Sequence, residues 1–207
     1  MTDEASRAPR GEDRRRAVLE TAAALFFERG YAATSIDAII ARAGGSKRNI
    51  YAQFGSKAGL FTAIVSQNAD QALATLEIDE AAGRDLRETL AAFGRRLLEV
   101  YMSPTVLGIY RVVVAEAHRD RALAEAFYDK GPGRTSAALR EVLERAAARG
   151  EIAMLDPAIH AEHFVGLTRD NLHLQVVLGL RPPPAPAEID AIVRSAVALF
   201  LDGLRPR

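Results

Sequence analysis

The stretch SKRNIYAQF, Ser46–Phe54, concentrates side chains that can form directional hydrogen bonds. At the helical step of about 100° per residue, Ile50 and Phe54 point to one side, and Arg48 and Asn49 point to the other. A helix this short cannot build a core of its own. The spacing therefore predicts a helix that rests on a core with one side and offers polar groups to a partner with the other.

The polar side of this helix has the chemistry that reads DNA bases. Arginine can donate two hydrogen bonds to guanine and asparagine can pair with adenine, so Arg48 and Asn49 are candidate base contacts. The small Ala52 permits close approach to a thymine methyl group or to the sugar backbone. The other polar residues of this helix are Lys47, Tyr51 and Gln53. The alternative interpretation is that these residues are only the solvated face of a small helix.

The preceding residues predict a second short helix that would position the first. Its apolar stripe runs from Ile36 to Ala43 and ends at Gly44-Gly45. Two short helices joined by a glycine-containing turn have the form of a helix-turn-helix, whose second helix enters the DNA major groove. Thr34 and Ser35 precede the stripe, where their hydroxyl groups can cap the helix and its free N–H groups can hold a phosphate.

Two lysines extend the candidate contacts to the DNA backbone. Lys47 is predicted just off the end of its helix, and Lys57 opens the next helix, where it could clamp the far side of the groove. The charges agree, since residues 1–60 hold ten Lys or Arg against seven Asp or Glu, whereas the whole chain is formally neutral. A modestly basic end is consistent with one phosphate-facing surface.

Apolar residues recur at helical spacing along the chain, and the alternation typical of strands is scarce. We expect an all-α protein of about nine or ten helices. We assign residues 1–11 to a disordered tail, 12–56 to a helix-turn-helix domain and 57–207 to a larger helical domain for ligand binding and dimerisation. The helix that begins near Lys57 is expected to belong to both parts.

Composition and motifs weigh against other classes of protein. The 207 residues include no cysteine, so disulfides and thiolate chemistry are excluded. The first twelve residues are polar, unlike a secretory signal, and no apolar run approaches the roughly 20 residues of a membrane span, so we expect a cytoplasmic protein. No phosphate loop, nucleophile elbow or metalloprotease helix is present, so we assign no catalytic residue and no cofactor. An architectural DNA-binding protein would be smaller and far more basic.

The stretch ATSIDAIIARAGGSKRNIYAQFGSKAGLFTAIV, residues 33–65, resembles the DNA-binding domain of the TetR family of bacterial transcriptional regulators. The preceding AALFFERGYAATS is similar to the first helix of that family. The positions that match the family pattern are Thr34, Ser35, Ala43, Gly44, Ser46, Tyr51, Phe54, Ser56 and Lys57. Gly45 departs from the pattern, in which valine is usual, and we expect the loss of that apolar side chain to loosen the turn.

The resemblance implies contacts and a mode of action. Tyr51 would contact a phosphate, and the residues that would meet bases or backbone are Lys47, Arg48, Asn49 and Gln53. The protein would be a repressor that binds a palindromic operator of double-stranded DNA as a homodimer and is released by an apolar small molecule. The residues do not distinguish repression from activation. The stretch EAFYDKGPGRTSAALREVLERAAARGEI, residues 125–152, is similar to the multidrug-efflux repressors of this family.

Candidates for the small-molecule pocket are apolar and aromatic residues of the middle helices, with a few polar groups. They are Phe93, Leu97, Tyr101, Tyr110, Val113, Phe127, Phe164, Asn171 and His173. For each of them, ordinary core packing is the alternative.

The predicted dimer surface is formed by the last two helices, about residues 157–178 and 187–204. Its candidates are His163, Ile192, Ala196, Val197 and Phe200, and the alternative is that this stripe faces its own core. His160 and His163 have a spacing that could offer two metal ligands. Because no third ligand lies nearby in the sequence, we assign no metal site.

Overall fold

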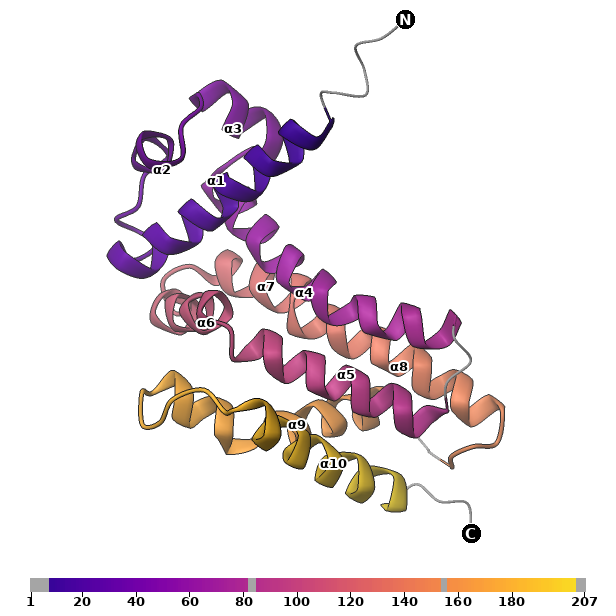
Figure 1. Cartoon of the computed structure of the whole chain (residues 1–207). Coiled ribbons are helices and arrows are strands. Elements are labelled where there is room, and N and C mark those ends of the chain that lie inside the picture. The colour runs from indigo at the N-terminus through magenta and orange to yellow at the C-terminus, as the bar shows by residue number, and fades with distance from the viewer. Residues whose placement is uncertain (1–7, 82–84, 154–155, 204–207) are drawn as a thin grey trace, which may run out of the picture. The chain divides into compact units, whose positions relative to one another are not determined.

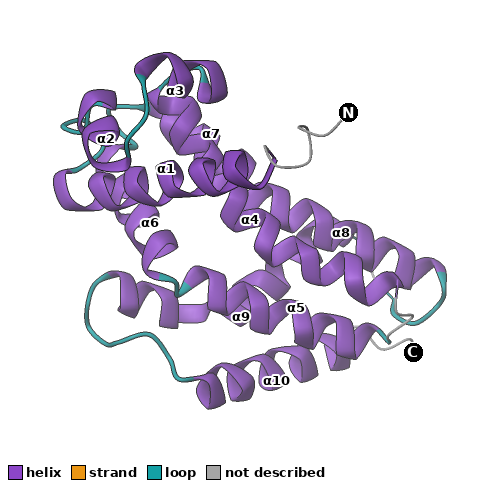
Figure 2. Cartoon of the chain, turned by 45° about the horizontal axis from the view of Figure 1, so that its top comes forward, coloured by secondary structure: helices purple, strands orange, loops and turns teal. Residues whose placement is uncertain are grey.

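The computed structural model describes residues 8–81, 85–153 and 156–203. Within these residues the chain forms ten helices and no strand, which confirms the all-α prediction (Figures 1 and 2). The helices are α1 (Ala8–Arg29), α2 (Ile36–Ala43), α3 (Lys47–Phe54), α4 (Lys57–Ala81), α5 (Leu86–Tyr101), α6 (Pro104–Glu116), α7 (Arg121–Lys130), α8 (Pro132–Ala148), α9 (Pro157–Val177) and α10 (Pro186–Gly203).

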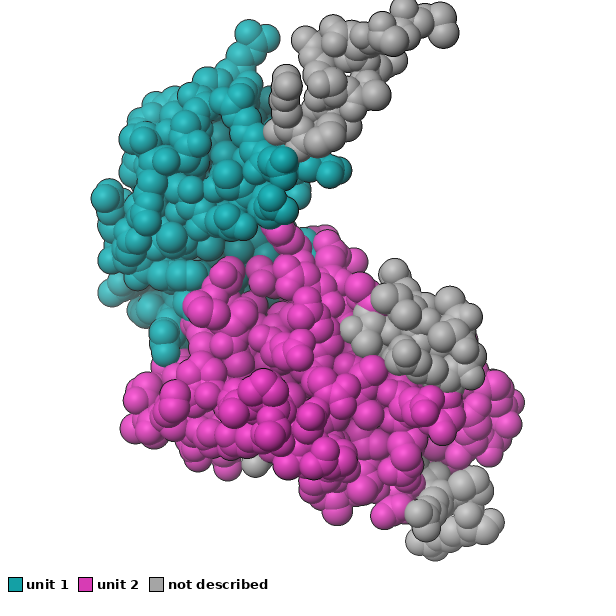
Figure 3. Space-filling view, in the orientation of Figure 1, with its two compact units in different colours: residues 1–66, 108–127 teal, residues 67–107, 128–207 magenta. Residues whose placement is uncertain are grey.

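The chain divides into two compact units (Figure 3). Unit 1 contains residues 1–66 and 108–127, and unit 2 contains residues 67–107 and 128–207. The first division lies inside α4, between Ser66 and Gln67, so α4 contributes to both units. Of the predicted tail, residues 1–7 lie outside the described residues and α1 begins at Ala8. Leu204, which ends the predicted last helix, also lies outside them.

The core of unit 1 is built from α1 to α4 together with α6 and α7. Phe26, Tyr31 and Phe61 form an aromatic group at its centre, with ring centroids 5.2–6.0 Å apart. α6 approaches α1 closely at Gly108, where an added Cβ would come within 2.4 Å of the Phe27 ring. Residues 108–127, which the sequence places in the larger domain, thus supply apolar side chains that complete this core.

The core of unit 2 is formed by α5 and α8 to α10 with the second half of α4. Phe93 of α5 stacks on Phe164 of α9 at 6.3 Å, and Phe164 meets Phe200 of α10 at 5.2 Å. α5 and α10 approach closely at Gly94, where an added Cβ would lie 3.1 Å from Val193. No single described helix is long and apolar enough to cross a membrane; α5 and α6 meet the criteria only as a broken pair.

Candidate nucleic-acid interface

α2 and α3 are two short helices whose ends are fixed by side-chain caps and glycines. The Ser35 Oγ accepts a hydrogen bond from the Ala38 N–H at 3.1 Å, and the Ser46 Oγ accepts one from the Asn49 N–H at 3.3 Å. Between the helices, Gly44 and Gly45 have φ values of 78° and 108°, which favour glycine. This geometry confirms the predicted pair of helices joined by a glycine turn.

The polar side of α3 faces outward. Ile50 is 2% exposed in the core of unit 1, whereas Arg48, Asn49, Ala52 and Gln53 are exposed. The Tyr51 side chain is 49% exposed, which is unusual for a large aromatic residue in a small domain. No carboxylate of the described residues lies within ion-pair distance of Arg48. The helical geometry therefore presents an arginine and an asparagine, side by side, to whatever binds this face.

Lys47 begins α3 and forms an ion pair with Asp37 of α2, with Nζ and Oδ2 2.8 Å apart. The hydrogen bond from Lys47 to Asp37, and then the charge of Asp37, raise the pKa of Lys47. Both side chains are more than half exposed, and exposed ion pairs contribute little to stability. Lys47 can therefore exchange this partner for a phosphate at small cost.

Thr34 does not belong to the exposed surface, contrary to its prediction as a DNA contact. Its side chain is 1% exposed. The single Oγ1 proton is shared between two backbone carbonyls, that of Gly30 at 2.8 Å and that of Leu25 at 3.1 Å. The cap of α2 is Ser35, which is exposed. Thr34 instead ties the end of α1 to the start of α2.

Lys57 was expected to clamp a phosphate, but the structure gives its ammonium group other partners. The Lys57 Nζ donates to the backbone carbonyls of Tyr31 at 2.9 Å, Ala32 at 3.4 Å and Thr34 at 3.1 Å. It also lies 4.4 Å from the centre of the Tyr31 ring. Since an ammonium group has three donors, this set occupies all of them.

The surroundings of Lys57 are consistent with this role. Burial lowers the pKa of Lys57, and the negative charges of Glu116 and Asp120 oppose that effect. The role was missed because the acceptors are backbone carbonyls about 25 residues away. The sequence held one indication of this role. Lys57 lies in the first turn of a helix, where a positive charge interacts unfavourably with the helix dipole unless another group stabilises it.

Comparison with known proteins decides the family. Residues 18–64 match the family described as bacterial regulatory proteins, tetR family. Residues 88–203, more than half of the chain, match the C-terminal domain of AefR-like transcriptional repressors. The chain belongs to the TetR family. This TetR-family protein is a transcriptional regulator and not an enzyme.

Solved structures agree over almost the whole TetR-family chain. A TetR-family regulator from Mesorhizobium loti is 27% identical, with a TM-score of 0.78 over 95% of this chain and 99% of that one. The flavonoid-responsive regulator FrrA is 32% identical, with a TM-score of 0.71 over the same shares. The fatty acid degradation regulator FadR from Bacillus halodurans, at 16% identity, shares the fold with a TM-score of 0.72 over 94% of this chain and 97% of that one. A search among curated protein sequences found no match.

The residues predicted to line a small-molecule pocket are divided between the two units of the TetR-family fold. Tyr110, Val113 and Phe127 belong to unit 1, where the rings of Tyr110 and Phe127 lie 6.1 Å apart. Asn171 is exposed on α9. The members in the core of unit 2 are Phe93, Leu97, Tyr101, Phe164 and His173.

Within unit 2, a polar group lies among these apolar residues. The rings of Tyr101 and His173 are 5.4 Å apart, edge to face, and the Arg169 guanidinium carbon is 5.8 Å from the centre of the Tyr101 ring. Burial and then the positive charge of Arg169 lower the pKa of His173 to about 4. His173 is therefore neutral near pH 7.

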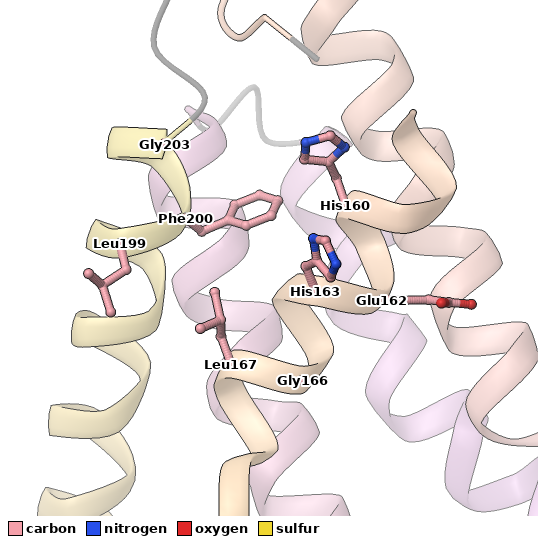
Figure 4. Close-up of a pocket in the computed structure, with 8 residues that line it drawn as sticks. All are labelled: His160, Glu162, His163, Gly166, Leu167, Leu199, Phe200 and Gly203. Carbon is pink, nitrogen blue, oxygen red and sulfur yellow. The ribbon is translucent and has the colours of Figure 1, made fainter. Parts of the chain in front are cut away.

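Four of the five predicted dimer residues lie on two grooves between α9 and α10. One groove, of about 540 Å³, includes His163 and Phe200 (Figure 4), and the other, of about 630 Å³, includes Ile192 and Ala196. Val197 lines neither groove, because it is 2% exposed and packs in the core of its own unit. Ala196 and Phe200 are also buried, at 3% and 6% exposure. Leu167 and Leu199, which the sequence analysis does not single out, line both grooves and are 41% and 64% exposed.

The histidine pair lies at the edge of the first groove. His160 and His163 have ring centroids 6.1 Å apart, and His160 also faces Phe200 at 6.5 Å, as Figure 4 shows. Glu162 points away from both rings. Across the part of the chain that the structure describes, no group of three or more His, Cys, Asp or Glu is arranged to hold a metal ion.

Proposed function

We propose that this protein is a repressor that binds a palindromic operator as a homodimer and leaves it when an apolar small molecule binds. The observation that carries the proposal is the outer face of α3, where Arg48 and Asn49 are exposed while Ile50 anchors the helix in the core. A helix held in this way can enter the major groove with its first residues toward the base edges.

The polar side chains of α3 and the serines that cap α2 and α3 contact the DNA in the proposed complex. Arg48 donates to guanine, and Asn49 pairs with adenine. The contacts to phosphates are Ser35 and Ser46 with the neighbouring free N–H groups, and Lys47, Tyr51 and Gln53. Lys47 releases Asp37 when it takes a phosphate.

The proposed dimer forms through α9 and α10. TetR-family regulators act as dimers, and in this chain the exposed Leu167 and Leu199 supply apolar surface on neighbouring helices. Burial of such side chains against a second copy would remove them from water. A two-fold dimer would place two copies of α3 about 34–36 Å apart, one turn of DNA.

The proposed effector binds in unit 2 and acts through α4. Tyr101 and His173 supply polar groups among the aromatic residues of that core, which suits a mostly apolar molecule. α4 contributes to both units, so a shift of α4 would couple the effector to α3 with a typical coupling of about 1–3 kcal/mol. FrrA responds to flavonoids, so flavonoids are the first class to test. Because the proposed operator is part of the bacterial chromosome, we propose that the protein acts in the cytoplasm.

Selection of genomic DNA fragments by the purified protein tests the proposal. We expect the recovered fragments to share an inverted repeat whose half-sites lie about 10 base pairs apart, or a multiple of that, centre to centre. Addition of flavonoids or other apolar molecules to the complex should then release the DNA. Recovery of fragments without a shared sequence would contradict an operator-binding role.

A further inference from the structure

Two arginines of α1 lie against the ends of α3. The Nη2 atom of Arg14 is 3.5 Å from the position that a Cβ on Gly45 would occupy, next to the Ser46 cap of α3. The guanidinium carbon of Arg15 lies 5.7 Å from the centre of the ring of Phe54, the last residue of α3. The two side chains thus reach opposite ends of the helix that carries Arg48 and Asn49.

Gly45 lies beside the Arg14 side chain. At φ 108° a side chain would be strained, and its Cβ would already be in van der Waals contact with the Arg14 guanidinium. Gly45 was expected to loosen the turn, and in the structure this strained backbone position lies next to the Arg14 guanidinium.

The charges of Arg14 and Arg15 are not neutralised by neighbouring carboxylates. Both side chains are exposed, and no carboxylate among the described residues lies within ion-pair distance of either. Arg16 instead pairs with Asp13 at 2.9 Å, and Arg42 pairs with Glu28 at 2.7 Å. Arg15 lies over the Phe54 ring, and this contact favours one arrangement of its side chain before any partner arrives, which lowers the entropy lost on binding.

We propose that Arg14 and Arg15 bind phosphates of the DNA backbone that flank the base pairs read by α3. The planar guanidinium group can donate two parallel hydrogen bonds to a phosphate, and ring contact leaves its edge free to do so. This inference rests on the proposed function, and it adds α1 to the DNA-binding surface.

The test compares the wild-type protein with the double variant R14A/R15A on a selected fragment and on a scrambled duplex of equal length. Each lost phosphate contact should reduce the slope of log K against log salt by about 0.9, so the double variant should lose about 1.8. Between 50 and 200 mM salt, the wild-type affinity should therefore fall about tenfold more than that of the variant. The ratio between the two duplexes should stay unchanged.

Two further variants separate a phosphate contact from other roles. Arg16→Ala removes a charge from the same helix that already has a carboxylate partner, and it should leave the slope nearly unchanged. R14K/R15K keeps both charges and should keep the slope. An unchanged slope in R14A/R15A, or an equal loss in the lysine variant, would overturn the inference. Thermal melting of each variant verifies folding.

Failure of the proposed function would appear differently in this experiment. If the wild-type protein does not prefer the selected fragment and Asn49→Ala changes nothing, operator recognition is wrong, whatever Arg14 and Arg15 do. If the wild-type protein discriminates but its slope does not depend on Arg14 and Arg15, only the present inference falls.

Discussion

At the scale of single residues, the surface around α3 separates side chains that are exposed to a partner from side chains that hold the domain together. Arg48 and Asn49 project outward beside the buried Ile50. Thr34 and Lys57 look alike in the sequence as polar residues near helix ends, yet both bond to backbone carbonyls inside unit 1. The difference lies in their partners and cannot be read from residue type.

Arg48→Ala should weaken binding to the selected operator by about 1–3 kcal/mol, because a guanine would lose two hydrogen bonds. The loss should depend on one base pair. We would measure affinities for a set of operators with single base-pair changes. The variant should no longer distinguish bases at one position while keeping its preference at the others; equal weakening on every duplex would show that Arg48 meets only the backbone.

Lys57→Ala should lower the free energy of unfolding by about 1–3 kcal/mol, because three carbonyls lose a charged donor. DNA affinity should fall only because the domain is less stable, so the slope of log K against log salt should stay the same. Denaturant unfolding and salt titration of DNA binding measure the two effects. Lys130→Ala, at an exposed position, is the matched control. A stable variant whose slope falls by about one would restore Lys57 to the phosphate contacts.

At the scale of helices, the sequence was informative because local patterns determine local structure. The stripe from Ile36 to Ala43 and the pair Ile50 and Phe54 predicted α2 and α3, and the expected starts at Lys57 and at about residue 157 coincide with α4 and α9. Packing between helices depends on contacts far apart in the chain. Val197 illustrates this: the stripe on α10 was visible, but which part of it faces α5 and α9 was not.

The end of α3 meets the start of α4 at a position where only glycine fits. A Cβ on Gly59 would lie 1.9 Å from the Phe54 carbonyl oxygen, a backbone atom that cannot rotate away. Alanine normally favours a helix over glycine by about 1 kcal/mol. Here Gly59→Ala should instead destabilise the protein by about 1–3 kcal/mol and weaken DNA binding.

Thermal melting and operator binding check the effect of Gly59→Ala. Gly11→Ala is the matched control, since Gly11 is also helical and an added Cβ there would have no neighbour within 4 Å. A Gly59→Ala variant as stable as Gly11→Ala would show that α3 can shift away from α4 without cost.

At the scale of the whole molecule, the two units divide residues that the sequence groups together. Tyr110, Val113 and Phe127 look like pocket residues beside Phe93 and Phe164, but Val113 and Phe127 pack in the core of unit 1, and the Tyr110 ring lies against Phe127. Apolar periodicity shows that a helix has a buried face and does not show which core receives it. The fold class and the outer face of α3 were therefore predictable, whereas the membership of a pocket was not.

The dimer surface gives a prediction with opposite outcomes for neighbouring residues of α10. Leu199→Asp should raise the dimer dissociation constant by a factor on the order of 100, because symmetry places the change on both partners. Val197→Asp should instead destabilise each subunit by about 3–5 kcal/mol, since it buries an unpaired charge.

Sedimentation velocity and thermal melting separate these outcomes. Ala187→Asp, exposed in the first turn of α10 and outside both grooves, should change neither the dimer nor the stability. An intact dimer in Leu199→Asp would move the interface away from α9 and α10.

The ion pair between Lys47 and Asp37 has a consequence for the ionic balance of DNA binding. When a phosphate displaces Asp37, the DNA sheds a sodium ion, but the abandoned carboxylate is then ready to attract one from solution. Part of the entropy gained when the duplex releases counterions is therefore lost again when the freed carboxylate attracts one. We therefore predict that Asp37 makes operator binding less dependent on salt concentration than the number of lysines and arginines at the interface suggests.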